Sequence, residues 1–423
     1  MNHLRARASR LAPPALLAAA ALCLLVVPAA AAKTYSDVSA KYWDHKAIDW
    51  VTDQGVPGMH VLDDFAGTGL FKPGHAVTRE QLARAVVLAS GHEADTVDPA
   101  IPVADVAPDD PFFHDIQVVM RLKLMNVYKD GFHPDASATA WQADLAVVRL
   151  LKVMDPSADW GVLPGLNPAS WEPNTGWKTD APRYFATEVA SRYLGLRKDH
   201  SSDKLEVSPG QPMPRSEVAY LLYQALHVSS WRIAGLATFD KVTLPTLSDR
   251  QKQIVAFAFK YVGYPYVWGG EYPGTDSPYG TQEHGGFDCS GFVWWVLKMN
   301  FGYTLNERTA AGMAASAKPR ITRAHLIPGD ILFFGPNGPS SSAASIYHAA
   351  LYLGAGWFIH STGSADGVSL SSLNWKGWSW QTDFAWGRRV LKKGQFKAAA
   401  PLASPVATAA APPPSPAVTT DQP

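Results

Sequence analysis

The hydrophobic pattern of the first half of the chain repeats. Each repeat is predicted to form a helix, a loop that contains glycine or proline, and a second helix. Three segments share this pattern, at about residues 34–90, 103–154 and 182–228. In the first two, Phe71 precedes Thr78 by the same number of residues as Phe132 precedes Thr139, and the threonine opens the second helix. A two-helix unit of this size cannot bury its apolar face alone, so we expect the three units to pack together.

A different pattern marks residues 248–393. Gln251–Val262 has helical periodicity, and so does the stretch that begins at Phe292. Residues 346–353 and 357–361 alternate as two strands, with glycine-rich turn material between them. Helices beside a small antiparallel sheet predict an α+β domain here, after an all-α domain that spans residues 33–228.

Three further stretches carry neither pattern. Residues 1–32 combine basic residues with the apolar run Ala15–Val27 and a small-residue cleavage site, which predicts a secretory signal peptide. An uncleaved membrane anchor is the alternative, although a span needs roughly 20 apolar residues. We interpret residues 229–247 as a linker. Residues 394–423 are mostly Ala, Pro, Ser and Thr, which predicts a disordered tail.

Charge and cysteine content narrow the possible functions. The 423 residues include 37 Lys and Arg and 37 Asp and Glu, so the net charge is +0 and gives no support to a nucleic-acid partner. Of the 2 cysteines, Cys23 lies in the predicted signal peptide, which leaves Cys289 as the only thiol of the mature protein. Because exported proteins usually pair their cysteines, a single thiol is either intermolecular or reactive.

Cys289 lies at the predicted start of a helix. Unpaired main-chain N–H groups and the helix dipole at such a place stabilise a thiolate and are expected to lower the pKa of the thiol. The alternative is that Cys289 is a small buried hydrophobic residue.

Two histidines could assist this thiol. A three-residue loop at 353–355 would place His348 directly opposite His360 on one face of the hairpin, with Cβ atoms about 4.5–5.5 Å apart. This arrangement suits a base that is oriented by a second polar ring. A zinc site made from Cys289, His348 and His360 is the rival, although no fourth ligand stands at a clear spacing.

At this point the chain resembles the NlpC-type cell-wall peptidases, a papain-like family. The matching motifs are Pro265-Tyr266-Val267-Trp268-Gly269-Gly270, Asp288-Cys289-Ser290-Gly291-Phe292 and Leu326-Ile327-Pro328-Gly329-Asp330-Ile331, followed by His348 and His360. The resemblance implies a papain-like α+β domain with Cys289 as nucleophile, His348 as base and His360 as the third polar residue. It implies no cofactor and no metal.

The same resemblance implies a substrate. The family hydrolyses peptide bonds in peptidoglycan stem peptides, often the bond from D-γ-glutamate to a diamino acid. Tyr266, Asp288 and Ser290 would line the substrate site. The loop Glu271–Gly286 looks longer than usual and is expected to reshape the cleft. An inactive wall-binding module and a related thiol amidase or acyltransferase are the alternatives.

The three helical segments resemble S-layer-homology repeats, which come in threes and bind polymers of the bacterial envelope. In that family the start of the second helix contacts the polymer, and Thr78, Arg79 and Arg215 match those positions, whereas Ala140 departs from them. The resemblance implies that the repeats hold a secreted, monomeric enzyme on a secondary cell-wall polymer at the cell surface.

Overall fold

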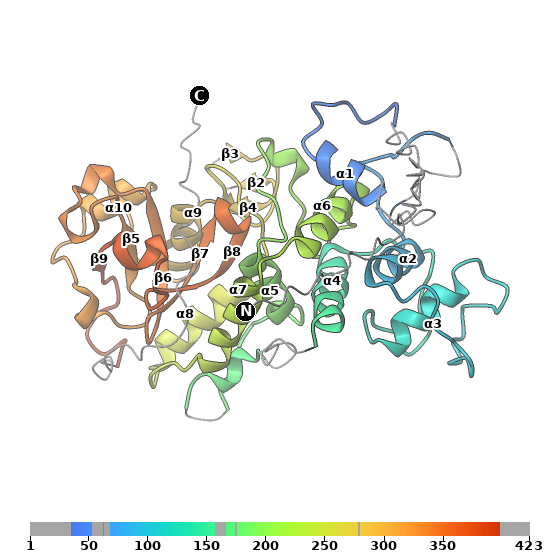
Figure 1. Cartoon of the computed structure of the whole chain (residues 1–423). Coiled ribbons are helices and arrows are strands. Elements are labelled where there is room, and N and C mark those ends of the chain that lie inside the picture. Colours follow the sequence, from blue (N-terminus) through green and yellow to red (C-terminus); the bar gives the residue numbers. More distant parts are fainter. Residues whose placement is uncertain are drawn as a thin grey trace, which may run out of the picture.

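The computed structural model describes residues 35–52, 62, 68–156, 166–173, 176–277 and 280–397. The predicted signal peptide and most of the predicted tail lie outside these residues. Within the described ranges, no helix is both long enough and apolar enough to cross a membrane. Figure 1 shows a helical half, coloured blue to green, beside a half that contains the main sheet.

Each of the three N-terminal segments holds two helices. They are α1 (His45–Thr52) and α2 (Arg79–Ser90), α3 (Phe113–Arg121) and α4 (Ala140–Met154), and α5 (Phe185–Leu194) and α6 (Arg215–Leu226). Thr78 caps α2, as predicted, because its side chain accepts a hydrogen bond from the Gln81 N–H while the Gln81 side chain accepts one from the Thr78 N–H. This cap satisfies main-chain donors that a helix start leaves unpaired.

A closed ring of main-chain hydrogen bonds ties the three segments together. The Val77 N–H donates to the Met213 carbonyl at 2.9 Å, the Ala138 N–H to the Val77 carbonyl at 2.8 Å, and the Met213 N–H to the Ala138 carbonyl at 2.8 Å. All three side chains are fully buried. Because the bonds form a ring, one segment cannot leave without breaking two of them.

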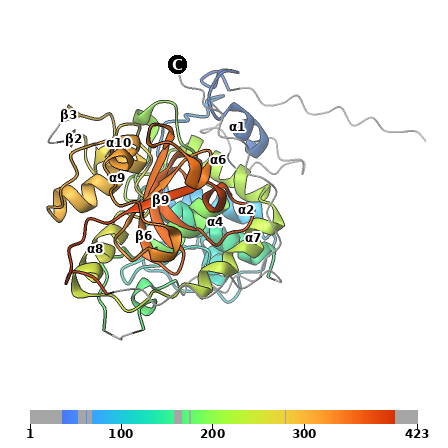
Figure 2. The same cartoon turned by 90° about the vertical axis from the view of Figure 1, so that its left-hand side faces the viewer.

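The second half contains a five-stranded antiparallel sheet. Its strand order is β8 (Gly367–Ser372), β7 (Trp357–Thr362), β6 (His348–Gly354), β5 (Ile331–Phe334) and β9 (Phe384–Arg388). The helices of this half are α8 (Asp249–Phe259), α9 (Cys289–Trp294), which continues as the π-helix η5 (Trp295–Asn300), α10 (Ala310–Ala315) and α11 (Ser379–Thr382). Figure 2 views the molecule from the side of this half. Alternate residues of each strand enter two cores, since Leu351 and Ile359 belong to the core shared with the helices, whereas Tyr352 and Phe358 pack with Trp380 on the other face.

The predicted linker, residues 229–247, is folded rather than extended. It contains α7 (Ser230–Gly235) and the 3-10 helix η4 (Leu236–Lys241). Phe239 is fully buried, and its ring lies 5.3 Å from that of Tyr193 and 5.4 Å from that of Trp357. The apolar side chains of this stretch therefore join the two halves into one continuous core.

A buried cluster of charges also joins the two halves. Arg192 on α5 is 0% exposed at its side chain and lies 3.1 Å from the Asp366 carboxylate and 3.4 Å from that of Glu188. Its guanidinium also donates to the carbonyls of Ala365, at 3.1 Å, and Gly263. Buried charges are tolerated only when they are paired and hydrogen bonded. These contacts therefore fix α5 against the turn between β7 and β8.

We predict that Arg192→Ala strongly destabilises the protein. The substitution leaves Asp366 and Glu188 buried without this cation, and breaking a buried ion pair in this way costs about 3–5 kcal/mol. A urea titration should show a fall of that size in the free energy of unfolding. The control Lys204→Ala breaks the exposed pair with Glu283 and should cost less than about 1 kcal/mol. Equal losses from the two substitutions would contradict the role assigned to Arg192.

Candidate active site

The side chain of Asp288 defines the start of α9. Its Oδ1 accepts a hydrogen bond from the Gly291 N–H at 2.6 Å and another from the Ser290 hydroxyl at 3.0 Å. Cys289 is therefore the first residue of the helix, as the sequence predicts. It is only 8% exposed, because α9 packs against β6 and β7.

A chain of hydrogen bonds runs across the sheet beside this helix. His348 Nε2 lies 2.8 Å from His360 Nδ1, and His360 Nε2 lies 3.0 Å from Ser371 Oγ. The main-chain N–H of Ala349 hydrogen bonds to the Cys289 sulfur, so the strand that carries His348 passes beside the thiol. The structure thus joins His348 to His360 and places Cys289 beside Ala349, the residue that follows His348. It adds Ser371, which the sequence did not indicate.

The register of the hairpin differs from the prediction. Tyr352 pairs with Phe358, and Gly354 with Trp357, so the turn has two residues rather than three. Ala355 and Gly356 both adopt positive φ, at 51° and 90°, which is the geometry of the favoured two-residue hairpin turns. The predicted pairing of His348 directly with His360 is therefore wrong by two residues. A shift of two keeps both side chains on the same face, where they meet diagonally.

Burial determines the protonation of these groups. Burial, together with the charge of Asp288, raises the pKa of the Cys289 thiol to about 12, although the N–H groups of Ala349 and Ser290 act in the opposite direction. Burial also lowers the pKa of His348 to about 3, and burial with the neighbouring His348 lowers that of His360. The N–H group of Ser290 at the helix start thus acts in the predicted direction, but burial outweighs it, so the prediction of a net lowering of the thiol pKa is wrong. At neutral pH the resting site holds a neutral thiol and neutral imidazoles.

The three predicted substrate residues surround the nucleophile. Tyr266 forms a parallel bridge with Phe287, which leads into Asp288. Burial, with the charges of Cys289 and Asp288, raises the pKa of the Tyr266 phenol, so it stays protonated. Both oxygens of Asp288 are already hydrogen bonded within the protein. Contact of Tyr266, Asp288 and Ser290 with substrate stays a prediction.

Arg308 is a central residue of this site that sequence reasoning missed. Its guanidinium bonds to both carboxylate oxygens of Asp288 at 3.0 Å, to the Ser290 hydroxyl at 3.0 Å and to the Glu271 carboxylate at 2.8 Å. It also donates to the carbonyls of Gly269 and Gly270. One clue was available, since Arg308 is the single arginine between residues 251 and 319, a region rich in glycine.

The long loop before Cys289 is folded. Its short strands form two antiparallel pairs, β1 (Glu271–Tyr272) with β4 (Gly286–Phe287) and β2 (Asp276–Ser277) with β3 (Gly280–Thr281). The loop also reaches the helical half, because His284 Nε2 lies 2.9 Å from Gln211 Oε1 and Glu283 lies 3.2 Å from Lys204. The third helical segment therefore supports the loop beside the candidate site.

The residues predicted to bind a wall polymer lie apart from this site and have structural contacts. Arg79 and Arg215 are 2% and 3% exposed. Arg79 Nε donates to the Phe132 carbonyl and Arg215 Nε to the Phe71 carbonyl, each at 2.7 Å, and each guanidinium stacks on the same phenylalanine ring. Both arginines therefore lock one segment to the next, and their burial leaves them no room to contact a polymer. Thr78 serves as the cap of α2.

The rival zinc arrangement gains no support from the geometry. The described residues contain no group of three or more His, Cys, Asp or Glu side chains arranged to hold a metal ion. The 2.8 Å contact between His348 and His360 has the length of a hydrogen bond.

Comparison with known proteins identifies the fold of this half. A model described as the NlpC/P60 family matches residues 263–387. Residues 263–387 form an NlpC/P60 domain. The sheet and the Cys289 helix belong to this papain-like domain, whereas the three helical segments precede the matched residues.

Individual relatives match parts of the chain. It is 26% identical over 218 residues to the gamma-D-glutamyl-L-lysine dipeptidyl-peptidase of Bacillus cereus, which covers 51% of this chain and 59% of that protein. It is 37% identical over 122 residues to protein P54 of Enterococcus faecium, covering 29% and 20% of the two chains. A solved structure of an NlpC/P60 family protein from Bacillus cereus is 27% identical, covers 34% of this chain and 40% of that one, and has a TM-score of 0.28. The chain thus spans less than two thirds of the length of these relatives.

We predict that alkylation of Cys289 by iodoacetamide accelerates with pH up to pH 10 without a plateau. Only the thiolate reacts, and a thiol with a pKa of about 12 gains roughly tenfold in thiolate per pH unit over this range. Mass spectrometry of the Cys289 peptide gives the rate, and free cysteine, which levels off above its pKa of about 8.5, is the control. A constant rate between pH 5 and pH 8 would instead show a preformed thiolate.

Proposed function

We propose that the chain is a secreted peptidoglycan hydrolase, a cysteine endopeptidase that cleaves the bond from D-γ-glutamate to a diamino acid in stem peptides. The observation that carries this proposal is the arrangement of Cys289 at a helix start beside the hydrogen-bonded pair of His348 and His360, within an NlpC/P60 domain. The Bacillus cereus relative is named for the gamma-D-glutamyl-L-lysine bond, and this name supports the choice of that bond as the one cleaved here. A probable peptidoglycan endopeptidase of Bacillus subtilis, 36% identical over 130 residues, supports the substrate class.

The proposed reaction begins from the neutral site. His348 takes the proton of the Cys289 thiol as the sulfur attacks the amide carbonyl, and the Cys289 N–H helps to stabilise the oxyanion. The His348 imidazolium then protonates the leaving amine, and the C–N bond breaks to give a thioester. Water, deprotonated by His348, hydrolyses the thioester and restores the thiol.

His360 and Ser371 act on His348 rather than on substrate. The contact between His348 Nε2 and His360 Nδ1 leaves His348 Nδ1 as the nitrogen for the thiol proton. The bond from His360 to Ser371 holds the second ring in place. This chain of contacts orients the base and fixes its tautomer.

The helical half would hold this enzyme on the cell wall. The three-segment arrangement, closed by the Val77–Met213–Ala138 ring, supports a repeat domain of the S-layer-homology type that binds a secondary cell-wall polymer. Retention on the wall raises the effective concentration of the enzyme at its substrate. The sequence pattern of residues 1–32 supports export to the cell surface.

We predict that the two histidines differ in the effect of their removal. His348→Ala should lower kcat on the peptide L-Ala-γ-D-Glu-L-Lys by roughly a hundredfold to ten-thousandfold, the usual contribution of a general base. His360→Gln keeps a polar partner for His348 and should retain measurable turnover, whereas His360→Ala should be slower than His360→Gln. Steady-state release of lysine measures all three rates.

The exposed His325 provides the matched control, and His325→Ala should leave the rate unchanged. The assignment of the base would be wrong if His348→Ala kept more activity than His360→Ala.

A further inference from the structure

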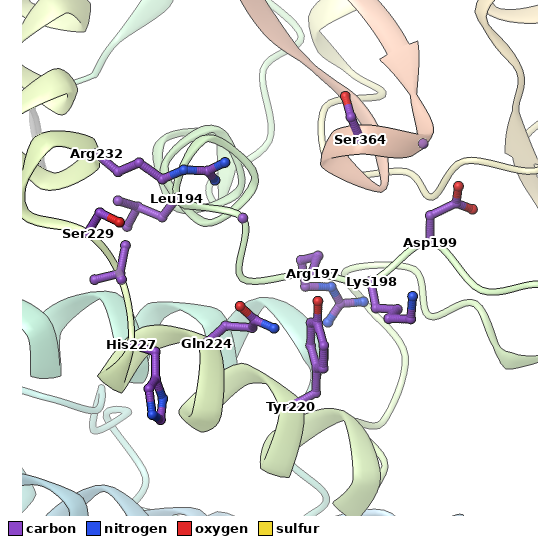
Figure 3. A pocket seen from close by; sticks show the side chains of 13 residues that line it. Leu194, Arg197, Lys198, Asp199, Tyr220, Gln224, His227, Ser229, Arg232 and Ser364 are labelled. Atoms are coloured by element: carbon purple, nitrogen blue, oxygen red, sulfur yellow. The ribbon is translucent and has the colours of Figure 1, made fainter. Parts of the chain in front are cut away.

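A hollow of about 470 Å³ lies where the third helical segment meets the NlpC/P60 domain (Figure 3). Its walls come from the stretch after α5, from α6, from the start of α7 and from the turn after β7. Cys289, His348 and His360 are not among its lining residues. The hollow therefore lies beside the candidate active site and not within it, since its lining residue Gly363 also borders Tyr266.

Two cations of this hollow, Lys198 and Arg232, make no close ion pair with a carboxylate of the described residues, although burial raises the pKa of Asp199 and of Asp44 and the charge of nearby Lys198 opposes that rise. Arg232 donates from Nη1 to the Tyr193 carbonyl at 3.3 Å, its guanidinium lies 5.3 Å from the centroid of the Trp231 ring, and burial lowers the pKa of this guanidinium. Figure 3 shows Arg232 and Lys198 on two sides of the hollow. By contrast, Arg197 is already paired with carboxylates, since its guanidinium lies 3.7 Å from Asp366 and 4.0 Å from Asp144.

The remaining lining is mainly neutral and polar. Tyr220 and Gln224 project from α6 towards the hollow, and Ser229 and Ser364 add hydroxyl groups (Figure 3). Asp199 is the only carboxylate among the lining residues. It lies against the turn after β7, because a Cβ added to Gly363 would meet Asp199 Oδ2 at 2.2 Å. The hollow therefore offers hydrogen-bonding groups to a hydroxylated ligand and positive charge to an anion.

We propose that this hollow binds a phosphate group, with its adjoining polyol or sugar, of an anionic wall polymer. Phosphate oxygens accept strong charge-assisted hydrogen bonds from guanidinium and ammonium groups, and the amide and hydroxyl groups suit polyol hydroxyls. The proposal rests on the proposed wall retention. It assigns polymer binding to residues other than Arg79 and Arg215, because the donors of those two arginines are engaged inside the protein.

The position of the hollow gives this binding a consequence. Gly363 and Ser364 belong to the turn that follows β7, the strand of His360, and the rest of the lining belongs to the helical half. A polymer bound here would sit across the junction of the two halves. The catalytic domain would then be held at a fixed position relative to the polymer, without a flexible connection.

The test measures binding of the full-length chain to soluble poly(glycerol phosphate), by calorimetry at low salt, alongside kcat/KM on L-Ala-γ-D-Glu-L-Lys. Lys198→Glu should raise the Kd for the polymer by roughly tenfold or more, and Lys198→Ala and Arg232→Gln should raise it less. The matched control Lys129→Glu makes the same charge change at an exposed site on the second segment and should raise Kd by less than about twofold. Peptide cleavage should be unchanged in all four variants.

Three results would overturn the proposal. The first is wild-type protein that does not bind the polymer, and the second is equal weakening by Lys198→Glu and Lys129→Glu, which would indicate unspecific charge attraction. The third is a rise in KM for the peptide with Lys198→Glu while polymer binding stays intact, which would assign the hollow to carboxylates of the stem peptide. Failure to cleave the peptide, with polymer binding as expected, would contradict the proposed endopeptidase activity and leave the binding proposal standing.

Discussion

The packing of α9 against β6 and β7 is the constraint on which the candidate site depends. It buries Cys289 beside the strand of His348, while the rings of Phe358 and Trp380 pack against the two histidines. Charge is costly in such a place, so the thiol and the imidazoles are neutral at rest. Proton transfer must therefore accompany attack on the substrate, and the geometry of the base matters more than a preformed thiolate. Arg308 and Asp288 set the start of the helix and hence the place of the sulfur.

The helical half supports this geometry from outside the NlpC/P60 domain. Arg192 holds the turn between β7 and β8, the two strands that carry His360 and Ser371. Phe239 fills the core between the halves. The loop before Cys289 contacts the third segment through the hydrogen bond of His284 with Gln211. A domain proposed to retain the enzyme on the wall thus also forms part of the structural support of its active site.

The sequence predicted those features that depend on local pattern. The lone thiol at a helix start and the two histidines on one hairpin face follow from helical spacing and from strand alternation. The exact register of the hairpin could not be predicted, because Ala355 adopts a positive φ that alanine seldom takes.

Features that depend on tertiary packing were not predicted. The direction of the shift in the thiol pKa was missed because the burial of Cys289 arises from such packing. Arg308 and Ser371 act through contacts between distant segments, which one sequence does not reveal. The repeat pattern located Arg79 and Arg215 at helix starts but could not show that neighbouring segments cover them.

The central claim is that Cys289 is the nucleophile, and Cys289→Ser tests it most directly. Serine is close in size to cysteine, so the protein should stay folded by circular dichroism, but a hydroxyl is a much weaker nucleophile at this site. The rate of lysine release from L-Ala-γ-D-Glu-L-Lys should fall by about a thousandfold or more. A folded Cys289→Ser protein that cleaves the peptide at a rate near that of the wild type would contradict the account.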